Sequence, residues 1–444
     1  MERNFTTGSI GKNVAVFSLP YFLTYFLQAL YGLADMYFIG RYNGADVITA
    51  VSVGSQLMHM ITVMIVGFSV ATTVTIGHGV GAGDKKKIAD TISSSIVLFT
   101  GIAVVATALL LITVSPIVEF LKTPSVSVEE TKAYLRICFG GIPFIVAYNV
   151  IAAIYRGLGD SRTPLYFVSV AAAVNIILDY LLVGPMEMKA AGAAIATIAA
   201  QAAAVVFALV FMRMKRKPGD SIGTGIKPGT SGIGGLAKIG LPVMLQEGFI
   251  QVSFIIITII ANSRGEEIAA AVGIVEKIIT FVFLVNSTMM STTASLCAQN
   301  LGAGNTARAK KVMYYCMSIS FSIGMLFFVI SNICPNVIVG QFTSDSNVTL
   351  YAAQYLRSYS IDCAFAAVHF CFSGYFNALG ISIATFAHNA ISIVTTRIPG
   401  TYLASIKFPS TLLPMGIAAP AGSLLSIFIC LGIFLWHNKK EKAD

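Results

Sequence analysis

NVAVFSLPYFLTYFLQALYGLADMYFIG, residues 13–40, is an apolar run with one charge in it. Asp35 is its only acidic or basic side chain. A helix of about 20 apolar residues crosses roughly 30 Å of hydrocarbon, and the bilayer interior offers no partner to a bare carboxylate. The run therefore predicts a membrane-spanning helix that carries one acid inside the membrane.

Similar runs recur along the whole chain of 444 residues, which is 56% hydrophobic, only 11% charged and has a mean hydropathy of +0.80. These values exclude an ordinary water-soluble domain. The polar start and the long first run argue against a cleaved signal peptide. We expect an all-α membrane protein with twelve transmembrane helices, at residues 13–40, 47–77, 90–114, 131–155, 163–183, 190–212, 236–262, 268–297, 312–333, 351–376, 383–405 and 413–436.

The basic residues are distributed unevenly between the predicted loops. Most of the 29 lysines and arginines fall in the N-terminus, in the loops after even-numbered spans and in the C-terminus. The positive-inside rule then places both termini in the cytoplasm, as in a multi-pass protein of the inner (plasma) membrane. The net charge of +9 is read as a topology signal, and no nucleic-acid partner is expected.

The chain divides into two similar halves joined by a segment rich in Gly, Pro, Ser and Lys. We expect an N-lobe at 1–213, a cytoplasmic linker at 214–235 and a C-lobe at 236–444. Because each half has six spans, both enter the membrane in the same sense, which predicts a parallel pseudo-twofold repeat of the kind found in transporters. The matches are Leu19-Pro20 with Leu241-Pro242, Ala50-Val51 with Ala271-Val272, Gly81–Gly83 with Gly302–Gly304, Leu135-Arg136 with Leu356-Arg357, Leu158-Gly159 with Leu379-Gly380, and Tyr180-Leu181 with Tyr402-Leu403.

The repeated Gly-Ala-Gly loops could cradle a phosphate group. No phosphate-binding motif surrounds them and no strand is predicted before them, so a tight turn between two helices is favoured.

A second membrane-embedded acid, Asp179, is the only charge between Arg162 and Glu187. Asn175 precedes it by four residues and shares its helix face, and the next span contributes Thr197. With Asp35 these side chains would form an all-oxygen cluster. Two carboxylates away from water must share a proton or hold a hard cation such as Na⁺, which predicts ion coupling. Alternatively, each acid is held by hydrogen bonds between helices.

The second half differs at the matching positions, where Arg397 stands for Asn175 and Gly400 or Thr401 stands for Asp179. The ion site should therefore be asymmetric. We expect Pro399-Gly400 to break the eleventh span and Arg397 to bind the freed carbonyl groups.

Glu247 and Gln251 share a face of the seventh span, where they could bind a cationic substrate. Glu247 could instead be a second proton site or pair with Lys277. Tyr31 and Tyr37 could contribute aromatic lining for a flat cation, although such residues more often face lipid.

Asp362 lies five residues after Arg357 and could pair with it near the external end of the span, or it could take part in transport. No C-x-x-C or H-E-x-x-H motif occurs among the seven cysteines and five histidines. The sequence therefore predicts no enzyme, no cofactor and no metal other than the coupling ion.

The chain resembles the multidrug and toxic compound extrusion (MATE) transporters, from LPYFLTYFLQALYGLADMYFIGRYNGADVITAVSVGSQL through YRGLGDSRTP, NIILDYLLV and GAAIATIAAQ to AVGIVEKIITFVFL, AQNLGAG and RIPGTYL. The resemblance implies two six-helix lobes arranged as an inverted V, and export of xenobiotic cations driven by Na⁺ or H⁺. It is closest to the DinF-like branch, whose N-lobe ion site falls on Asp35, Asn175, Asp179 and Thr197.

These observations predict a secondary active antiporter that exports amphipathic, cationic organic molecules by alternating access. We expect a monomer surrounded by lipid. The alternative is a flippase of lipid-linked saccharides from the related superfamily, for which the acids are unexpected.

Overall fold

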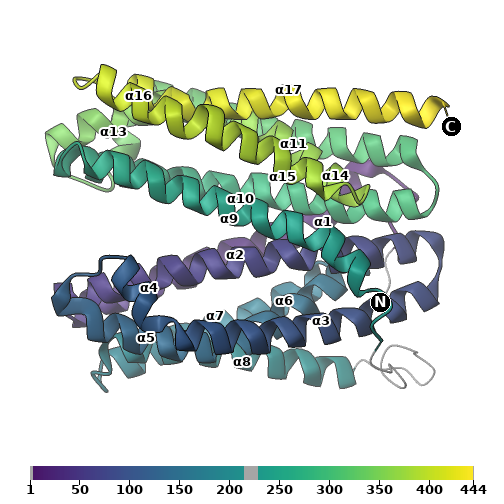
Figure 1. Ribbon diagram of the computed structural model, residues 1–444, viewed down its shortest axis with the longest axis horizontal. Coiled ribbons are helices and arrows are strands. Elements are labelled where there is room, and N and C mark those ends of the chain that lie inside the picture. Colours follow the sequence, from purple (N-terminus) through teal and green to yellow (C-terminus); the bar gives the residue numbers. More distant parts are fainter. Residues whose placement is uncertain (1–3, 215–228, 444) are drawn as a thin grey trace. The chain divides into compact units, whose positions relative to one another are not determined.

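The computed structural model describes residues 4–214 and 229–443, and all regular elements in these ranges are helices (Figure 1). The predicted linker, 214–235, lies largely outside the described residues. Contacts divide the chain into two compact units, one built on Leu19–Ala237 and the other on Phe5–Ser18 together with Lys238–Asp444. The first helix therefore begins in the second unit and continues in the first.

The first unit holds the predicted acid cluster. Within it α7 packs along α8, α2 along α6, and α5 against α8. Its elements are α1 (Ile10–Tyr42, from Leu19 onward), α2 (Ala45–Ala82), α3 (Lys85–Ile112), α4 (Val114–Phe120), η1 (Ser125–Ser127), α5 (Val128–Gly140), α6 (Ile142–Gly157), α7 (Arg162–Val183) and α8 (Lys189–Met214).

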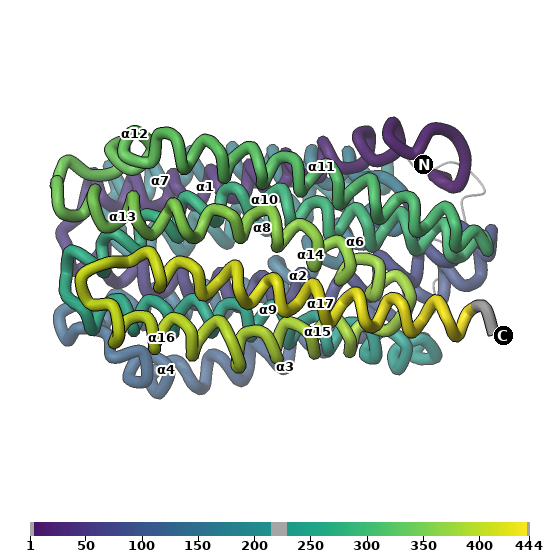
Figure 2. Tube along the Cα trace, turned by 90° about the horizontal axis from the view of Figure 1, so that it is seen from above, coloured from purple at the N-terminus to yellow at the C-terminus, as the bar shows by residue number. Residues whose placement is uncertain are grey.

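The second unit is built around α10, which packs along α14 and α11 (Figure 2). Its helices are α9 (Ile233–Asn262), α10 (Glu266–Gly302), α11 (Thr306–Ile333), α12 (Pro335–Val339), α13 (Ser346–Tyr359), α14 (Asp362–Ala378), α15 (Ser382–Ser392), the π-helix η2 (Ile393–Arg397), α16 (Ile398–Lys407) and α17 (Leu413–Ala443).

Nine continuous helices among the described residues are long and apolar enough to cross a membrane, or ten if one bent pair counts as a single span. That pair, Ser125–Gly140 and Ile142–Gly157, bends by 46°. A Cβ at Gly141, between the two parts, would collide with the Ile198 side chain of α8. The two other predicted spans, 351–376 and 383–405, fall on segments that are interrupted, namely α13–α14 and α15–η2–α16. The predicted all-helical architecture is confirmed, and its spans are less regular than a hydropathy pattern suggests.

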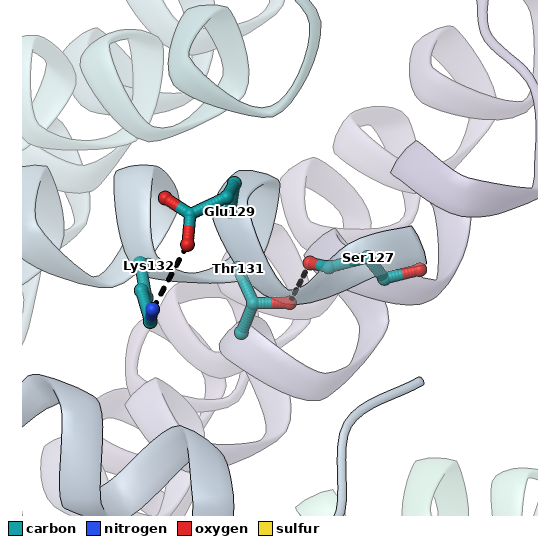
Figure 3. Close-up of polar contacts among 4 residues, drawn as sticks. All are labelled: Ser127, Glu129, Thr131 and Lys132. Atoms are coloured by element: carbon teal, nitrogen blue, oxygen red, sulfur yellow. Dashed lines mark hydrogen bonds and ion pairs between the residues drawn. The ribbon is translucent and has the colours of Figure 1, made fainter. Parts of the chain in front are cut away.

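Polar contacts mark the start of the bent span (Figure 3). The Thr131 hydroxyl donates to the Ser127 carbonyl at 2.7 Å, and the Lys132 Nζ atom lies 2.9 Å from the Glu129 carboxylate. These bonds stabilise the passage from η1 into the first turn of α5.

The two Gly-Ala-Gly loops are tight turns between consecutive helices, as predicted. Gly83 and Gly304 have positive φ angles of 68° and 73°, which suit a residue without a Cβ. Asp84 caps α3 by accepting from the Lys87 amide, and Asn305 caps α11 by accepting from the Arg308 amide.

The eleventh predicted span is widened before Pro399 rather than broken at Pro399-Gly400. Because proline has no N–H and its ring clashes with the carbonyl four residues earlier, the α-helical pattern cannot run through this point unchanged. The π-helix η2 precedes the proline, and α16 then continues the helix.

Candidate functional site

The four residues of the predicted acid cluster come together inside the first unit, from α1, α7 and α8. The Asp35 carboxylate lies next to the side chains of Asp179 and Asn175. The Thr197 hydroxyl lies 3.3 Å from Asp35 Oδ2 and 3.0 Å from the Ala193 carbonyl. Asp179 and Asn175 are fully buried, whereas Asp35 and Thr197 are partly buried. Residues far apart in the sequence thus form one oxygen-rich site.

Several polar atoms of this cluster have no hydrogen-bond partner within the described structure. They are Asp35 Oδ1, both carboxylate oxygens of Asp179, and the Asn175 side-chain oxygen and nitrogen. A buried polar atom without a partner is costly, and two adjacent carboxylates cannot both carry a bare charge. The arrangement can therefore take up a proton or surround a small hard cation with carboxylate, amide and hydroxyl oxygens.

The packing of α7 on α8 explains how this cluster forms. Asn175 and Asp179 share the buried face of α7. The facing part of α8 is lined by small buried residues, including Ala193, Ala196 and Ala200, so the two helix backbones approach closely. The Asn-x-x-x-Asp pair is thereby held at the depth of Thr197.

Gln201 extends the cluster and was not among the predicted site residues. Its Nε2 atom donates to the Tyr31 hydroxyl at 3.3 Å. Its spacing of four residues from Thr197 on α8 was the sequence signal that could have identified it. Tyr31 neighbours both Asp35 and Tyr148, which makes it part of the acid site.

Tyr37 does not join this cluster. Its side chain is 65% exposed, and its ring lies edge-on to Phe38 with centroids 5.5 Å apart. Because Tyr37 follows Asp35 by two residues on α1, the two side chains lie on different faces of the helix.

The predicted substrate residues of the second unit lie on α9. Glu247 and Gln251 are both partly buried. No ion pair joins Glu247 to Lys277 in the part of the chain that the structure describes, and Lys277 is exposed. The pairing considered for these two residues is therefore absent.

Asp362 does not pair with Arg357, which was one of the two roles that the sequence left open for it. Arg357 is exposed, whereas Asp362 is 1% exposed and interacts with Arg397 and Ser423. Both Asp362 and Arg397 line a cavity of about 40 Å³ in the second unit. Helix α13 ends at Tyr359 and α14 begins at Asp362, so Arg357 and Asp362 lie on different helices, which the five-residue spacing did not reveal.

The prediction for Arg397 was also wrong in its partner. Arg397 Nη2 donates to the Tyr359 hydroxyl at 2.7 Å, and its guanidinium lies 4.7 Å from the Phe254 ring centroid. Its hydrogen-bond and cation–π partners among the described residues are therefore aromatic side chains. Glu276, which the sequence did not single out as a site, interacts electrostatically with Arg397 and lies 3.5 Å from the Thr258 hydroxyl.

No group of three or more His, Cys, Asp or Glu side chains within the described ranges could hold a metal ion. The first-unit cluster contains two carboxylates, so any cation there would also need the amide and hydroxyl oxygens.

A family model named MatE matches the chain twice, over residues 20–181 and 242–403. The two matches begin at Pro20 and Pro242 and end at Leu181 and Leu403, so they confirm the internal duplication.

Curated relatives match over nearly the full length. The chain is 28% identical over 440 residues to a probable multidrug resistance protein, YpnP, of Bacillus subtilis, covering 99% of this chain and 98% of the relative. It is 24% identical over 385 residues to the multidrug export protein MepA of Staphylococcus aureus, with 85% and 83% covered.

Solved structures share the fold. An outward-facing multidrug resistance MATE family transporter of the MOP superfamily superposes with a TM-score of 0.90 at 20% identity, covering 99% of this chain and 97% of the other. A MOP superfamily transporter from Pyrococcus furiosus superposes with a TM-score of 0.88, also at 20% identity and with the same coverage.

Proposed function

The chain belongs to the MATE family of membrane transporters, and we propose that it exports amphipathic, cationic organic compounds in exchange for Na⁺ or H⁺. Relatives named as multidrug resistance and multidrug export proteins support export of drug-like molecules by a secondary transporter. The coupling ion and the charge of the substrate are the finer parts of the proposal.

The observation that carries ion coupling is the meeting of Asp35 and Asp179. Both lie in helices long and apolar enough to cross a membrane, and they are adjacent inside one unit. Buried acids in membrane proteins usually mark ion paths, because an uncompensated charge there is expensive. Asn175 and Thr197 provide the uncharged oxygens that a bound ion would need.

In the cycle that we propose, the ion and the substrate favour different conformations. A proton or Na⁺ arriving from outside binds Asp35 and Asp179. It stabilises the conformation of the first lobe in which the transporter has low drug affinity. Because binding equilibria are reciprocal, the drug must then weaken ion binding by the same factor. Alternating access carries the two solutes in opposite directions.

Glu247 and Gln251 are our proposed substrate contacts, together with Tyr31 and Tyr37. A partly buried carboxylate can attract an organic cation, and an aromatic ring can stack on its flat face. Glu247 supports this assignment because its carboxylate forms no ion pair in the described structure.

We place the protein in the plasma membrane as a monomer surrounded by lipid, with both termini cytoplasmic. The basic residues of the N-terminus, of the loops after even-numbered spans and of the C-terminus support this orientation.

The test is dye efflux from energised vesicles with the sodium gradient and the pH gradient imposed separately. Asp35→Asn and Asp179→Asn should each reduce ion-driven efflux by more than about tenfold, because each removes one charge that the ion must balance. Glu119→Gln, at an exposed acid of α4, is the matched control and should transport normally.

Normal gradient-driven efflux by both aspartate variants would reject ion coupling at this site. Glu247→Gln should weaken transport of a cationic dye more than that of an uncharged one. Transport of lipid-linked saccharides in place of dyes would instead support a flippase.

A further inference from the structure

The internal repeat shows which part of the second unit, called here the second lobe, corresponds to the acid site of the first unit, called the first lobe. The paired family matches, 20–181 and 242–403, set Asn175 against Arg397 and Asp179 against Thr401. Near Asp35 the second half has isoleucine, at 256 and 257. The second lobe has therefore lost both acids of the first-lobe cluster and gained a guanidinium.

Other acids surround that guanidinium. Arg397 is only 9% exposed and interacts electrostatically with Asp362 and Glu276. The repeat register around the matching Ala50-Val51 and Leu135-Arg136 pairs sets Glu276 against Ser55 and Asp362 against Gly141. The acids near Arg397 therefore lie on α10 and α14, whereas the acids of the first-lobe cluster lie on α1 and α7.

Asp362 and Arg397 are close without forming a direct ion pair. They line the same cavity of about 40 Å³, enough room for little more than one water molecule. Asp362 Oδ1 and Arg397 Nε both lack a hydrogen-bond partner within the described residues. The Tyr359 hydroxyl and the Phe254 ring hold the guanidinium in place.

We propose that Arg397 is a tethered cation, which fills in the second lobe the role that the exchangeable ion has in the first. This inference rests on the proposed function and deepens it, because it confines ion coupling to the first lobe. An arginine stays protonated throughout the physiological pH range and cannot leave the protein. Its single positive charge balances one carboxylate of the Asp362 and Glu276 pair, and that acid needs neither a proton nor Na⁺ for charge balance.

Several titratable groups face Arg397 and would contribute to any pH dependence of a variant. They come from α10, α13 and α14, and they are Glu276, Tyr355, Tyr359, Asp362 and His369, with His388 of α15 behind His369.

The experiment removes the tethered charge in an Asp35→Asn background, where the first-lobe site is already disabled. Thermal unfolding of the purified full-length protein is followed at varied Na⁺, with choline as replacement, and at varied pH. Arg397→Gln should introduce a new dependence, with a rise of about 1–2 °C for each tenfold increase in Na⁺ or H⁺. Arg397→Lys, which keeps a tethered charge, should introduce none.

Adding Asp362→Asn and Glu276→Gln to Arg397→Gln should abolish the new dependence. A folded Arg397→Gln protein that responds to neither ion would overturn the proposal. If Arg397→Gln fails to fold and the variant that also neutralises both acids folds, uncompensated acid charge is the cause and the proposal stands. If neither folds, Arg397 acts through packing and the proposal fails.

These results do not depend on whether Asp35 couples transport. Should Asp35→Asn leave efflux intact, the proposed function fails while the ion response of Arg397→Gln still reports on the second lobe. Measured ion-to-drug stoichiometry in the otherwise native chain adds a second readout, since Arg397→Gln should then raise it.

Discussion

In the first lobe two acids, an amide and a hydroxyl converge and leave oxygen atoms unpartnered, whereas in the second lobe an arginine faces two acids and donates to a tyrosine. The helices that carry these groups differ as well. Helix α7 runs unbroken from Arg162 to Val183, while its counterpart is divided into α15, η2 and α16. Under the roles proposed above, the two halves of one duplicated design balance buried charge differently, the first with an exchangeable ion and the second with a fixed guanidinium.

The difference indicates how one of two duplicated lobes can respond to ion gradients while the other does not. Charge neutralised by a covalently attached group is insensitive to the ion gradients, so that lobe contributes stability and shape. Charge left for a mobile ion makes the other lobe sensitive to those gradients. The strongest tests exchange the features of the two lobes.

The largest effect is expected from giving the first lobe the arginine of the second. Asn175→Arg would place a guanidinium beside Asp35 and Asp179, where it would compete with the coupling ion. We predict a loss of ion-driven efflux of more than about tenfold, equivalent to at least about 1.4 kcal/mol. Vesicle efflux under separate Na⁺ and pH gradients measures it.

Asn175→Gln serves as the control for the increase in side-chain size, because glutamine is longer than asparagine, keeps the amide and adds no charge. If it reduces ion-driven efflux as much as Asn175→Arg does, charge substitution is not the cause and the comparison of lobes loses this support.

The next effect concerns the anchor of Arg397. Tyr359→Phe removes the hydroxyl that accepts from Nη2 at 2.7 Å, which leaves a buried charged donor unpaired. Hydrogen bonds to charged groups contribute about 1.5–3 kcal/mol, so the protein should be destabilised by that amount. Thermal unfolding in detergent measures the loss, with the exposed Tyr402→Phe as control. Equal stability of the two variants would show that Tyr359 does not hold the guanidinium.

The sequence was sufficient for the first lobe because its signals are local. Asp35 and Asp179 stand out as charges in apolar runs, and the four-residue spacing of Asn175 and Asp179 gives their common face. The duplication was readable from short matches at nearly constant separation. These features need only helix periodicity and the cost of charge in a membrane.

The sequence was insufficient for the second lobe because its contacts depend on where helices end and where a π-helix replaces an α-helix. Asp362 begins a new helix and interacts with Arg397 rather than Arg357, and Arg397 is the last residue of the π-helix before Pro399. Neither change follows from a spacing rule. Gln201 is different, since its four-residue spacing from Thr197 places both on one face of the helix.

A smaller effect is expected at Thr197, whose hydroxyl is 3.3 Å from Asp35 Oδ2. Thr197→Val keeps the shape and removes the oxygen. The loss of one long hydrogen bond or one weak ion ligand, about 1 kcal/mol, should lower apparent ion affinity roughly fivefold. The ion concentration at half-maximal efflux measures this change, and Thr197→Ser, which retains the hydroxyl, should stay near the native value. Similar ion affinities for the valine and serine variants would remove Thr197 from the site.

The smallest effect distinguishes the two tyrosines of α1. Tyr31 accepts from Gln201 and neighbours Asp35, whereas Tyr37 is 65% exposed. Tyr31→Phe should shift the ion concentration at half-maximal efflux by about threefold to fivefold, as expected for one neutral hydrogen bond near the acids. Tyr37→Phe should leave it within about twofold, because surface changes away from buried networks have little energetic effect. A larger shift from Tyr37→Phe would mean that the ion site extends beyond the buried face of α1. The comparison between the exchangeable ion proposed for the first lobe and the fixed guanidinium proposed for the second would then have to include the exposed face of α1.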